Sequence, residues 1–300
     1  MKNKKIKLLF FSITIFCCGS SFSAYDLTYQ YAKGDGGLRF SLLEKMANIA
    51  NIFIETGTHK GNAVNNAKLF FDHVYSVEKE RSLYELCVNK FKDDENVHLF
   101  HNDSSIFLAE ILPNIPEKIF FWLDAHYGLS STPIRKELEE IKNRCIQPPI
   151  ILIDDIRDFS KTTNYPSVKQ LKQKLLSINK NYQFVLLLDA ALAFEKQLGL
   201  TVSPVLQACT TSYFFEIGAE ENEQAAIEAE KIISLAEGEE KKAILNSYKV
   251  FKEVAPFYFW AGLILLNDQK YNEAKHFFIE AKKRGCNNMR IDSYLNLCSQ

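Results

Sequence analysis

The sequence predicts an α/β fold: a Rossmann-like, mostly parallel seven-stranded sheet with helices on both faces, followed by a small all-helical repeat domain. Three observations support this prediction. Short apolar runs alternate with helix-like stretches between about residues 52 and 217. Several runs, such as IFFWLDA and IILIDD, are almost uniformly apolar, which is typical of strands covered on both faces. After residue 218 the strand-like runs stop, and Ala and Glu become frequent.

The composition is that of an ordinary globular protein. Hydrophobic residues make up 47% of the 300 residues and charged residues 24%, which excludes wholesale disorder and a collagen-like chain. The 36 basic residues nearly balance the 37 acidic ones, so the formal net charge is -1. Because this charge gives no electrostatic bias toward phosphate backbones, we expect no nucleic-acid partner.

The apolar runs define seven strands, and the stretches between the first five have apolar residues at helical spacing. Strand, helix and strand repeated in this way predict a parallel sheet with right-handed crossovers. No strong helix separates the last two runs, so an antiparallel edge strand is allowed there. The predicted strands are residues 52–55, 73–78, 97–102, 118–124, 149–154, 182–188 and 212–217.

Residues 1–24 have the pattern of a secretory signal peptide. Lysines crowd the first seven residues, an apolar run covers 8–18, and small residues cluster over 19–24. A basic start, a short apolar region and a small-residue exit are typical of such peptides. We therefore expect cleavage near residue 24 and export, either periplasmic or secreted. The alternative is an uncleaved segment that anchors the protein to a membrane.

The remaining chain is predicted to form an α/β domain over residues 25–218 and a helical domain over 219–300. One helical segment fits the tetratricopeptide template, in which small residues lie where two antiparallel helices touch. A single repeat has to pack on neighbouring helices, and we expect such a domain to offer a site for a protein partner. An ordinary amphipathic hairpin is the alternative. The matching residues are Tyr258, Ala261, Gly262, Leu265, Tyr271, Ala274, Phe278 and Ala281.

Acidic residues fall at the carboxyl ends of the first five predicted strands. In an open parallel sheet these ends meet at one rim, and ligands bind there beside the topological switch point. Stray surface acids would not fall on strand ends so regularly, so this rim is the predicted functional site. The acids are Glu55, Glu78, Asp103, Asp124, Asp154 and Asp155.

Two glycines bracket the turn after the first predicted strand. Gly57 and Gly61 lack side chains that would keep a ligand from backbone N–H groups at a helix start. Their GxxxG spacing and the acid beside them disfavour a pyrophosphate and suit a ligand with a positive charge and a ribose. Glu78 lies about 20 residues farther on, where an acid typically accepts hydrogen bonds from ribose hydroxyls. An ordinary tight strand-to-helix turn is the alternative role of both glycines.

These motifs resemble those of the class I S-adenosylmethionine-dependent methyltransferases over about residues 38–218. The likeness is carried by IETGTHKG, YSVEKE, HNDSS and the acidic strand ends. Within that class, FFWLDAHYG, PIRKELEEI, IILIDDIRDF and YPSVKQL resemble a group of bacterial methyltransferase-domain proteins. More distantly, the pattern is similar to metal-dependent sugar O-methyltransferases. The sequence departs from those sugar enzymes at Ala125-His126, where they have Gly and a second acid.

The resemblance implies S-adenosylmethionine as the methyl donor. Glu55, Gly57 and Gly61 would face the methionine part of this ligand. Glu78 would bind the ribose, and Asp103 and Ser104 would lie by the adenine. The assigned residues are Glu55, Gly57, Gly61, Glu78, Asp103, Ser104 and Asp124.

The resemblance also implies a divalent cation held by Asp124, Asp154 and Asp155. Three converging carboxylates repel one another, and Mg²⁺ would relieve that repulsion and lower the pKa of a coordinated hydroxyl. His126, whose ring titrates near neutrality, and Asp155 are the predicted catalytic residues. The alternatives are a structural hydrogen bond for His126 and capping of the following helix for Asp155.

The sequence therefore predicts an exported S-adenosylmethionine-dependent methyltransferase that acts on a hydroxyl of a small-molecule or glycan acceptor, with or without Mg²⁺. The alternative is a catalytically inactive scaffold that binds a protein partner through its helical repeat, because fold alone does not fix function. One further expectation concerns the acids of the segment PIRKELEEI. Glu137, Glu139 and Glu140 alternate with lysines and are predicted to form a solvated helix face.

Overall fold

The computed structural model describes residues 37–126, 131–159, 164–187, 190–200, 205, 208–209, 223–250, 255–288 and 290–299. The predicted signal peptide, the predicted strand 212–217 and the boundary at residue 218 lie outside these residues. Among the helices of this described part, none is both long and apolar enough to span a membrane.

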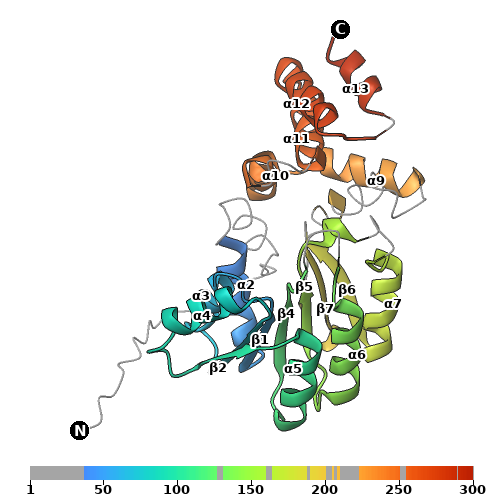
Figure 1. Ribbon diagram of the computed structural model, residues 1–300. Helices are drawn as coiled ribbons and strands as arrows, with labels where there is room; N and C mark the ends of the chain where they lie inside the picture. The colour runs from blue at the N-terminus through green and yellow to red at the C-terminus, as the bar shows by residue number, and fades with distance from the viewer. Residues whose placement is uncertain are drawn as a thin grey trace, which may run out of the picture.

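A sheet of seven strands in the order β3-β2-β1-β4-β5-β7-β6 forms the centre of the α/β part (Figure 1). Neighbouring strands among β1 to β5 pair in parallel, whereas β7 runs antiparallel to both β5 and β6. This confirms the predicted Rossmann-like, mostly parallel fold. The strands are β1 Ile52–Thr56, β2 His73–Glu78, β3 Val97–His101, β4 Ile119–Leu123, β5 Ile150–Ile153, β6 Tyr182–Leu187 and β7 Ala190–Glu195.

The structure contains a strand, β7, that the sequence prediction missed. It is Ala190–Glu195, which pairs with β6 along its whole length, and it lies between β5 and β6 instead of at an edge. Alanine is depleted in strands, so the run AALAFE does not read as one. All six of its residues are buried, so tertiary packing has overridden the weak local preference.

The helices lie on the two faces of the sheet (Figure 1). One group packs on β1, β2 and β3, and the other lies on the opposite face, where it contacts β2 and β6. The first group is α2 Gly37–Ala47, α3 Asn62–Ala67 and α4 Arg81–Lys90; the second is α5 Ser104–Ile111, α6 Ile134–Arg144 and α7 Val168–Ile178. Short 3-10 turns are η1 Leu112–Asn114, η2 Ile156–Asp158 and η3 Lys196–Leu198.

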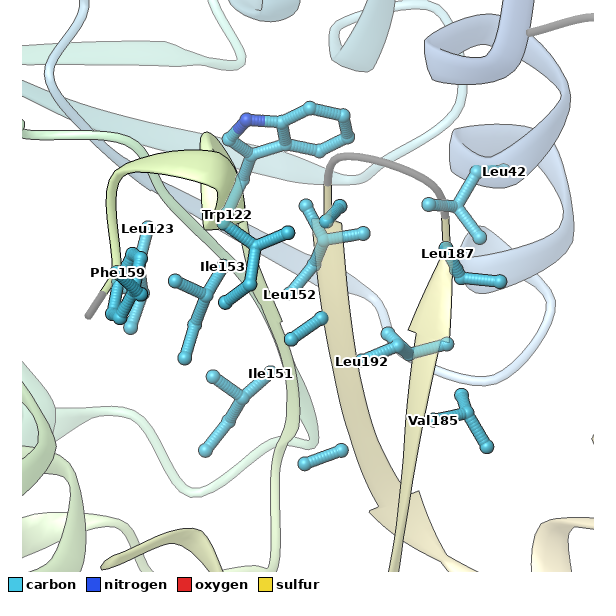
Figure 2. Packing of buried hydrophobic residues seen from close by; sticks show 14 of the residues in the cluster. Leu42, Trp122, Leu123, Ile151, Leu152, Ile153, Phe159, Val185, Leu187 and Leu192 are labelled. Carbon is cyan, nitrogen blue, oxygen red and sulfur yellow. The ribbon is translucent and has the colours of Figure 1, made fainter. Parts of the chain in front are cut away.

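The core lies between these two layers and the central strands. Every residue of β1, β4 and β5 is buried, as expected of strands covered on both faces. Figure 2 shows Ile151, Leu152 and Ile153 of β5 in a cluster that includes Val185 of β6 and Leu192 of β7. This packing fixes the carboxyl ends of the strands, on which the predicted site depends.

The last part of the chain is helical, and Figure 1 shows its helices gathered beyond one end of the sheet. They are α9 Glu223–Ser234, α10 Gly238–Val250, α11 Ala255–Asn267, α12 Tyr271–Lys283 and α13 Ile291–Leu297. Glu230 of α9 is buried and accepts hydrogen bonds from Nδ2 of Asn288 (2.9 Å) and Oη of Tyr294 (2.6 Å), and it pairs with Arg290 (2.8 Å). This network joins the first helix of the group to the last.

Helices α11 and α12 form the hairpin that the repeat template requires. Gly262 lies where they touch, because a Cβ built on it would come within 2.7 Å of the Phe278 ring. Ala274, Phe278 and Ala281 of α12 are buried. The hairpin has small and aromatic residues at the expected contacts, and its assignment as a tetratricopeptide repeat stays a prediction.

Gly262→Ala tests this contact. Alanine favours a helix over glycine by about 1 kcal/mol, but an added methyl group in a filled core typically costs about 1–3 kcal/mol. Because Phe278 is fully buried and has little room to move, we expect a lower free energy of unfolding in urea. The double variant Gly262→Ala/Phe278→Leu should recover part of the loss; no recovery would show that the two residues do not oppose each other.

Candidate functional site

Backbone hydrogen bonds continue the parallel ladder beyond the strand ends. The N–H of Asp124 donates to the carbonyl of Thr56 (3.0 Å), and the N–H of Asp154 donates to the carbonyl of Leu123 (3.1 Å). The N–H of Asn102 likewise donates to the carbonyl of Glu78 (3.3 Å). These links place Glu78, Asp124 and Asp154 along one rim at the carboxyl ends of their strands.

Gly57 lets the β1–α3 turn pass directly beside β4. Its φ is +86°, and a Cβ built on it would lie 2.5 Å from the carbonyl oxygen of Asp124 and 2.9 Å from Cα of Ala125. Both obstacles are backbone atoms, which cannot rotate away as a side chain can. The N–H groups of Gly57 and Thr58 donate to the carbonyl of Val77 (3.0 and 3.1 Å), which attaches the same turn to β2. A side chain at position 57 would therefore displace the rim.

Gly61 has a packing role as well. Its φ is +69°, and a Cβ would lie 2.5 Å from the Phe91 ring and 3.3 Å from Sγ of Cys87. Nζ of Lys90 donates to the carbonyls of Lys60 (2.8 Å) and Gly61 (3.3 Å). The space beside Gly61 is thus filled by α4 and its following residue. This contact supports the structural alternative for Gly61 and fixes the turn from the second side.

Glu78 holds the turn through its carboxylate. The N–H of His59 donates to Oε2 of Glu78 (2.7 Å), and the N–H of Glu80 donates to Oε1 (2.8 Å). His59 makes this contact in a left-handed backbone conformation, with φ +48°, which residues other than glycine rarely adopt. Each carboxylate oxygen has a second lone pair. Because Glu78 is only half-buried, these lone pairs can accept hydrogen bonds from a ligand's hydroxyl groups.

Glu55 is enclosed in a polar cluster beneath the turn. The hydroxyl of Ser76 donates to Oε2 of Glu55 (2.7 Å), and the hydroxyls of Thr58 and Ser76 lie 2.6 Å apart. All three residues are buried. Glu55 therefore lies beneath the turn, where it accepts a hydrogen bond from a hydroxyl of the protein itself.

Asp103 and Ser104 begin α5 at the end of β3. The carboxylate of Asp103 caps the helix by accepting from the N–H (3.0 Å) and hydroxyl (2.7 Å) of Ser105, and Lys79 lies 3.6 Å away. Partial burial acts to raise the pKa of Asp103. The hydrogen bonds of Ser105 and the charge of Lys79 outweigh burial, so this pKa lies below its ordinary value. Asp103 is thus ionised at the rim, and Ser104 beside it is buried.

His126 is held in place two residues after Asp124. Its Nδ1 lies 2.9 Å from Oγ1 of Thr132, and its ring packs edge-on against Phe159 and beside Tyr165. Burial raises the pKa of Tyr165 to about 12, with smaller contributions from the negative charges of Asp158 and Asp155. The predicted base therefore lies near the residues that follow β5. Nε2, the nitrogen left to take a proton, is buried, so a catalytic role requires that the neighbouring groups move, whereas the hydrogen bond with Thr132 suits a structural role as it stands.

Asp155 adopts a left-handed conformation with φ +53°. Its N–H donates to Oδ1 of Asp154 (3.0 Å). The Asp155 side chain makes no capping hydrogen bond to the η2 turn that follows, so the capping alternative is not supported. A strained conformation of a residue other than glycine is common at functional sites.

The magnesium hypothesis gains no support from this geometry. Within the ranges that the structure describes, no three His, Cys, Asp or Glu side chains are arranged to hold a metal ion. One oxygen of Asp154 already accepts the Asp155 N–H. Asp124, Asp154 and Asp155 therefore share the rim without forming a ligand set for a metal ion.

Glu137 corrects the prediction of a solvated helix face. Its side chain is 0% exposed, whereas Glu139 is exposed. Burial raises the pKa of Glu137 to about 7, against the weaker opposing effects of the hydroxyls of Ser104 and Thr56. The lysines nearby suggested a polar surface. The informative signal was helical spacing, because Glu137 lies three residues after Ile134 and four before Ile141, on the apolar face of α6.

Neither a protein-family model nor a curated protein sequence matches this chain. Its strand order, with β7 antiparallel to its neighbours, is that of a Rossmann-like α/β fold. It is similar to the solved structure of an O-methyltransferase from Bacillus cereus in complex with SAH. The two share 14% sequence identity with a TM-score of 0.44, and the match covers 58% of this chain and 90% of the other. It is also similar to the O-methyltransferase TomG from Streptomyces achromogenes in complex with SAM. Here the identity is 12% and the TM-score 0.43, and the match covers 59% of this chain and 91% of TomG.

Gly57→Ala tests the close approach of the turn to β4. The left-handed conformation costs a residue with a side chain about 1–2 kcal/mol, and the contact with Asp124 adds to it. Gly199→Ala is the matched control, because Gly199 has φ +64° and nothing lies within 4 Å of a Cβ built there. We expect Gly57→Ala to lower the free energy of unfolding clearly more than Gly199→Ala. Equal losses would contradict the contact.

Glu137→Gln tests the buried acid through the pH dependence of stability. The folded-state pKa of about 7 lies above the ordinary 4.5, so wild-type stability should fall as the pH rises from about 4.5 to about 7 and change no further above that window. The variant lacks this loss. The free energy of unfolding of Glu137→Gln, minus that of the wild type, should therefore rise by on the order of 3 kcal/mol across the window. Glu139→Gln is the control and should follow the wild type; a constant difference for Glu137→Gln would refute the buried acid.

Proposed function

We propose that this protein is an S-adenosylmethionine-dependent methyltransferase that transfers a methyl group to a hydroxyl of a small-molecule or glycan acceptor. The observation that carries the proposal is the half-buried Glu78 carboxylate, fixed by the N–H groups of His59 and Glu80 beside the glycine turn. A preorganised acceptor at the end of the second strand suits the two hydroxyls of a ribose.

The neighbouring groups suit the other parts of such a nucleoside. Asp103 and Ser104 begin α5 on the β3 side of Glu78 and would lie by the adenine. The turn Gly57–Gly61 lies on the β1 side and would face the methionine part. The acid-rich rim favours a ligand with a positively charged sulfonium over a pyrophosphate, because carboxylates attract the former and repel the latter.

The acceptor would lie on the other side of the sulfonium, toward the residues that follow β4 and β5. S-adenosylmethionine supplies an electrophilic methyl group with a good leaving group, so the protein mainly has to align the acceptor and remove its proton. In this proposal His126 takes the proton from the acceptor hydroxyl, since Thr132, Phe159 and Tyr165 hold its ring in one orientation. The strained Asp155 positions the acceptor beside it.

Calorimetry with S-adenosylmethionine tests the proposal on the purified protein. We expect binding by the wild type and at least tenfold weaker binding by Glu78→Gln, because the new amide cannot accept both backbone N–H groups and the ribose hydroxyls as well. Glu117→Gln, an exposed site just before β4, is the matched control and should bind normally. No heat with the folded wild type, or equal binding by Glu78→Gln, would refute the proposal.

A further inference from the structure

Glu137 is a fully buried acid that the proposed reaction does not use. It projects from α6 toward the end of β1 and the start of α5, where the hydroxyls of Thr56 and Ser104 are the neighbours that act on its ionisation. Thr56 and Ser104 are themselves buried. The three side chains therefore meet inside the layer between the sheet and the helices, directly below the rim.

The chemistry of this cluster favours a neutral Glu137. Neither carboxyl oxygen of Glu137, nor Oγ1 of Thr56, makes a hydrogen bond of good geometry to the described part of the chain, and all three atoms are buried. A neutral carboxyl has one donor and one free carbonyl acceptor. Small side-chain rotations would let the Ser104 hydroxyl donate to that carbonyl and the Glu137 hydroxyl donate to Thr56. Ionisation would instead place a negative charge among buried neutral hydroxyl groups.

The charged residue that acts on Glu137 also favours the neutral form of its carboxyl. Asp103, at the start of α5, is the charged residue that acts on it, and its negative charge also raises the pKa of Glu137. Arg135, Lys136 and Glu139 of α6 itself are exposed. Glu55 of β1 is adjacent in sequence to Thr56 and so points to the opposite face of the sheet. Helix α7 also packs on α6; its Lys169 and Lys172 are exposed and its Lys174 is partly buried. The 3-10 turn η1, which packs on α6 as well, has the sequence LPN and carries no charge.

We propose that Glu137 is a positioning residue of the nucleoside site: in its neutral form it links Thr56 at the end of β1 to Ser104 at the start of α5 and so holds the surface on which the adenine lies. The inference rests on the proposed function for the identity of the ligand. It adds that this surface is held from within α6, by a residue that does not touch the ligand, and that loss of one proton loosens it.

The direct consequence is a pH-dependent affinity. S-adenosylhomocysteine is the suitable probe, because its thioether carries no positive charge that an ionised Glu137 would attract. Wild-type affinity should fall as the pH rises through 7. If only the protein with neutral Glu137 binds the ligand, binding at pH 8.5 should be about 30-fold weaker than at pH 6.

Three variants separate positioning from simple stability, all measured by calorimetry at pH 6 and pH 8.5. Glu137→Gln keeps the shape and a donor without an ionisable group, so its affinity should be the same at both pH values. Glu137→Ala removes the link and should bind weakly at both. Glu139→Gln, on the exposed side of the same helix, should show the wild-type loss. A wild-type affinity that does not change with pH, or a Glu137→Gln variant that keeps the loss, would overturn the proposal.

Hydrogen exchange tests the same link without any ligand, which separates this inference from the proposed function. At pH 8.5 the amides of Phe107 and Leu108 in α5 should exchange faster in the wild type than in Glu137→Gln, and at pH 6 the two proteins should match. If S-adenosylhomocysteine does not bind but this difference is seen, the link stands and the methyltransferase proposal fails. If exchange is the same in both proteins at both pH values, Glu137 does not position α5.

Discussion

The rim of this protein depends on how closely the turn after β1 approaches its neighbours. The backbone of Gly57 lies against the backbone of Asp124, and Gly61 lies against the ring of Phe91. The N–H of His59 then meets the carboxylate of Glu78 at the end of β2. One short turn thus joins β1, β2, β4 and α4, so the acids at the strand ends acquire fixed relative positions. Without that approach, the strand-end acids would lose these relative positions.

A second constraint is the amount of polar chemistry buried beneath the rim. Glu55, Asp154 and Glu137 are all buried, and burial disfavours the charged form of a carboxyl unless hydrogen bonds or counter-charges compensate. Glu55 receives a hydrogen bond from Ser76, whereas the surroundings of Glu137 favour its neutral form. A fold that served only as a scaffold would be more stable with apolar residues at such positions. The buried acids therefore favour a functional rim over an inert one.

Much of the fold could be predicted because strands covered on both faces must be apolar and because parallel connections follow fixed rules. The seventh strand could not, since Ala190–Glu195 has weak strand preference and becomes a strand only through its pairing with β5 and β6. The rim acids could be predicted from their place at strand ends. The role of His59 could not, because it acts through its backbone N–H, and Glu137 was hidden by the charged residues beside it in sequence.

A crystal structure with S-adenosylhomocysteine is the measurement that bears most directly on this account of the rim. The account predicts ribose hydroxyls within hydrogen-bonding distance of the Glu78 carboxylate, adenine beside Asp103 and Ser104, and the thioether near the turn between Gly57 and Gly61. A ligand that occupies another surface, or that lies on this rim without contact to Glu78, would contradict it.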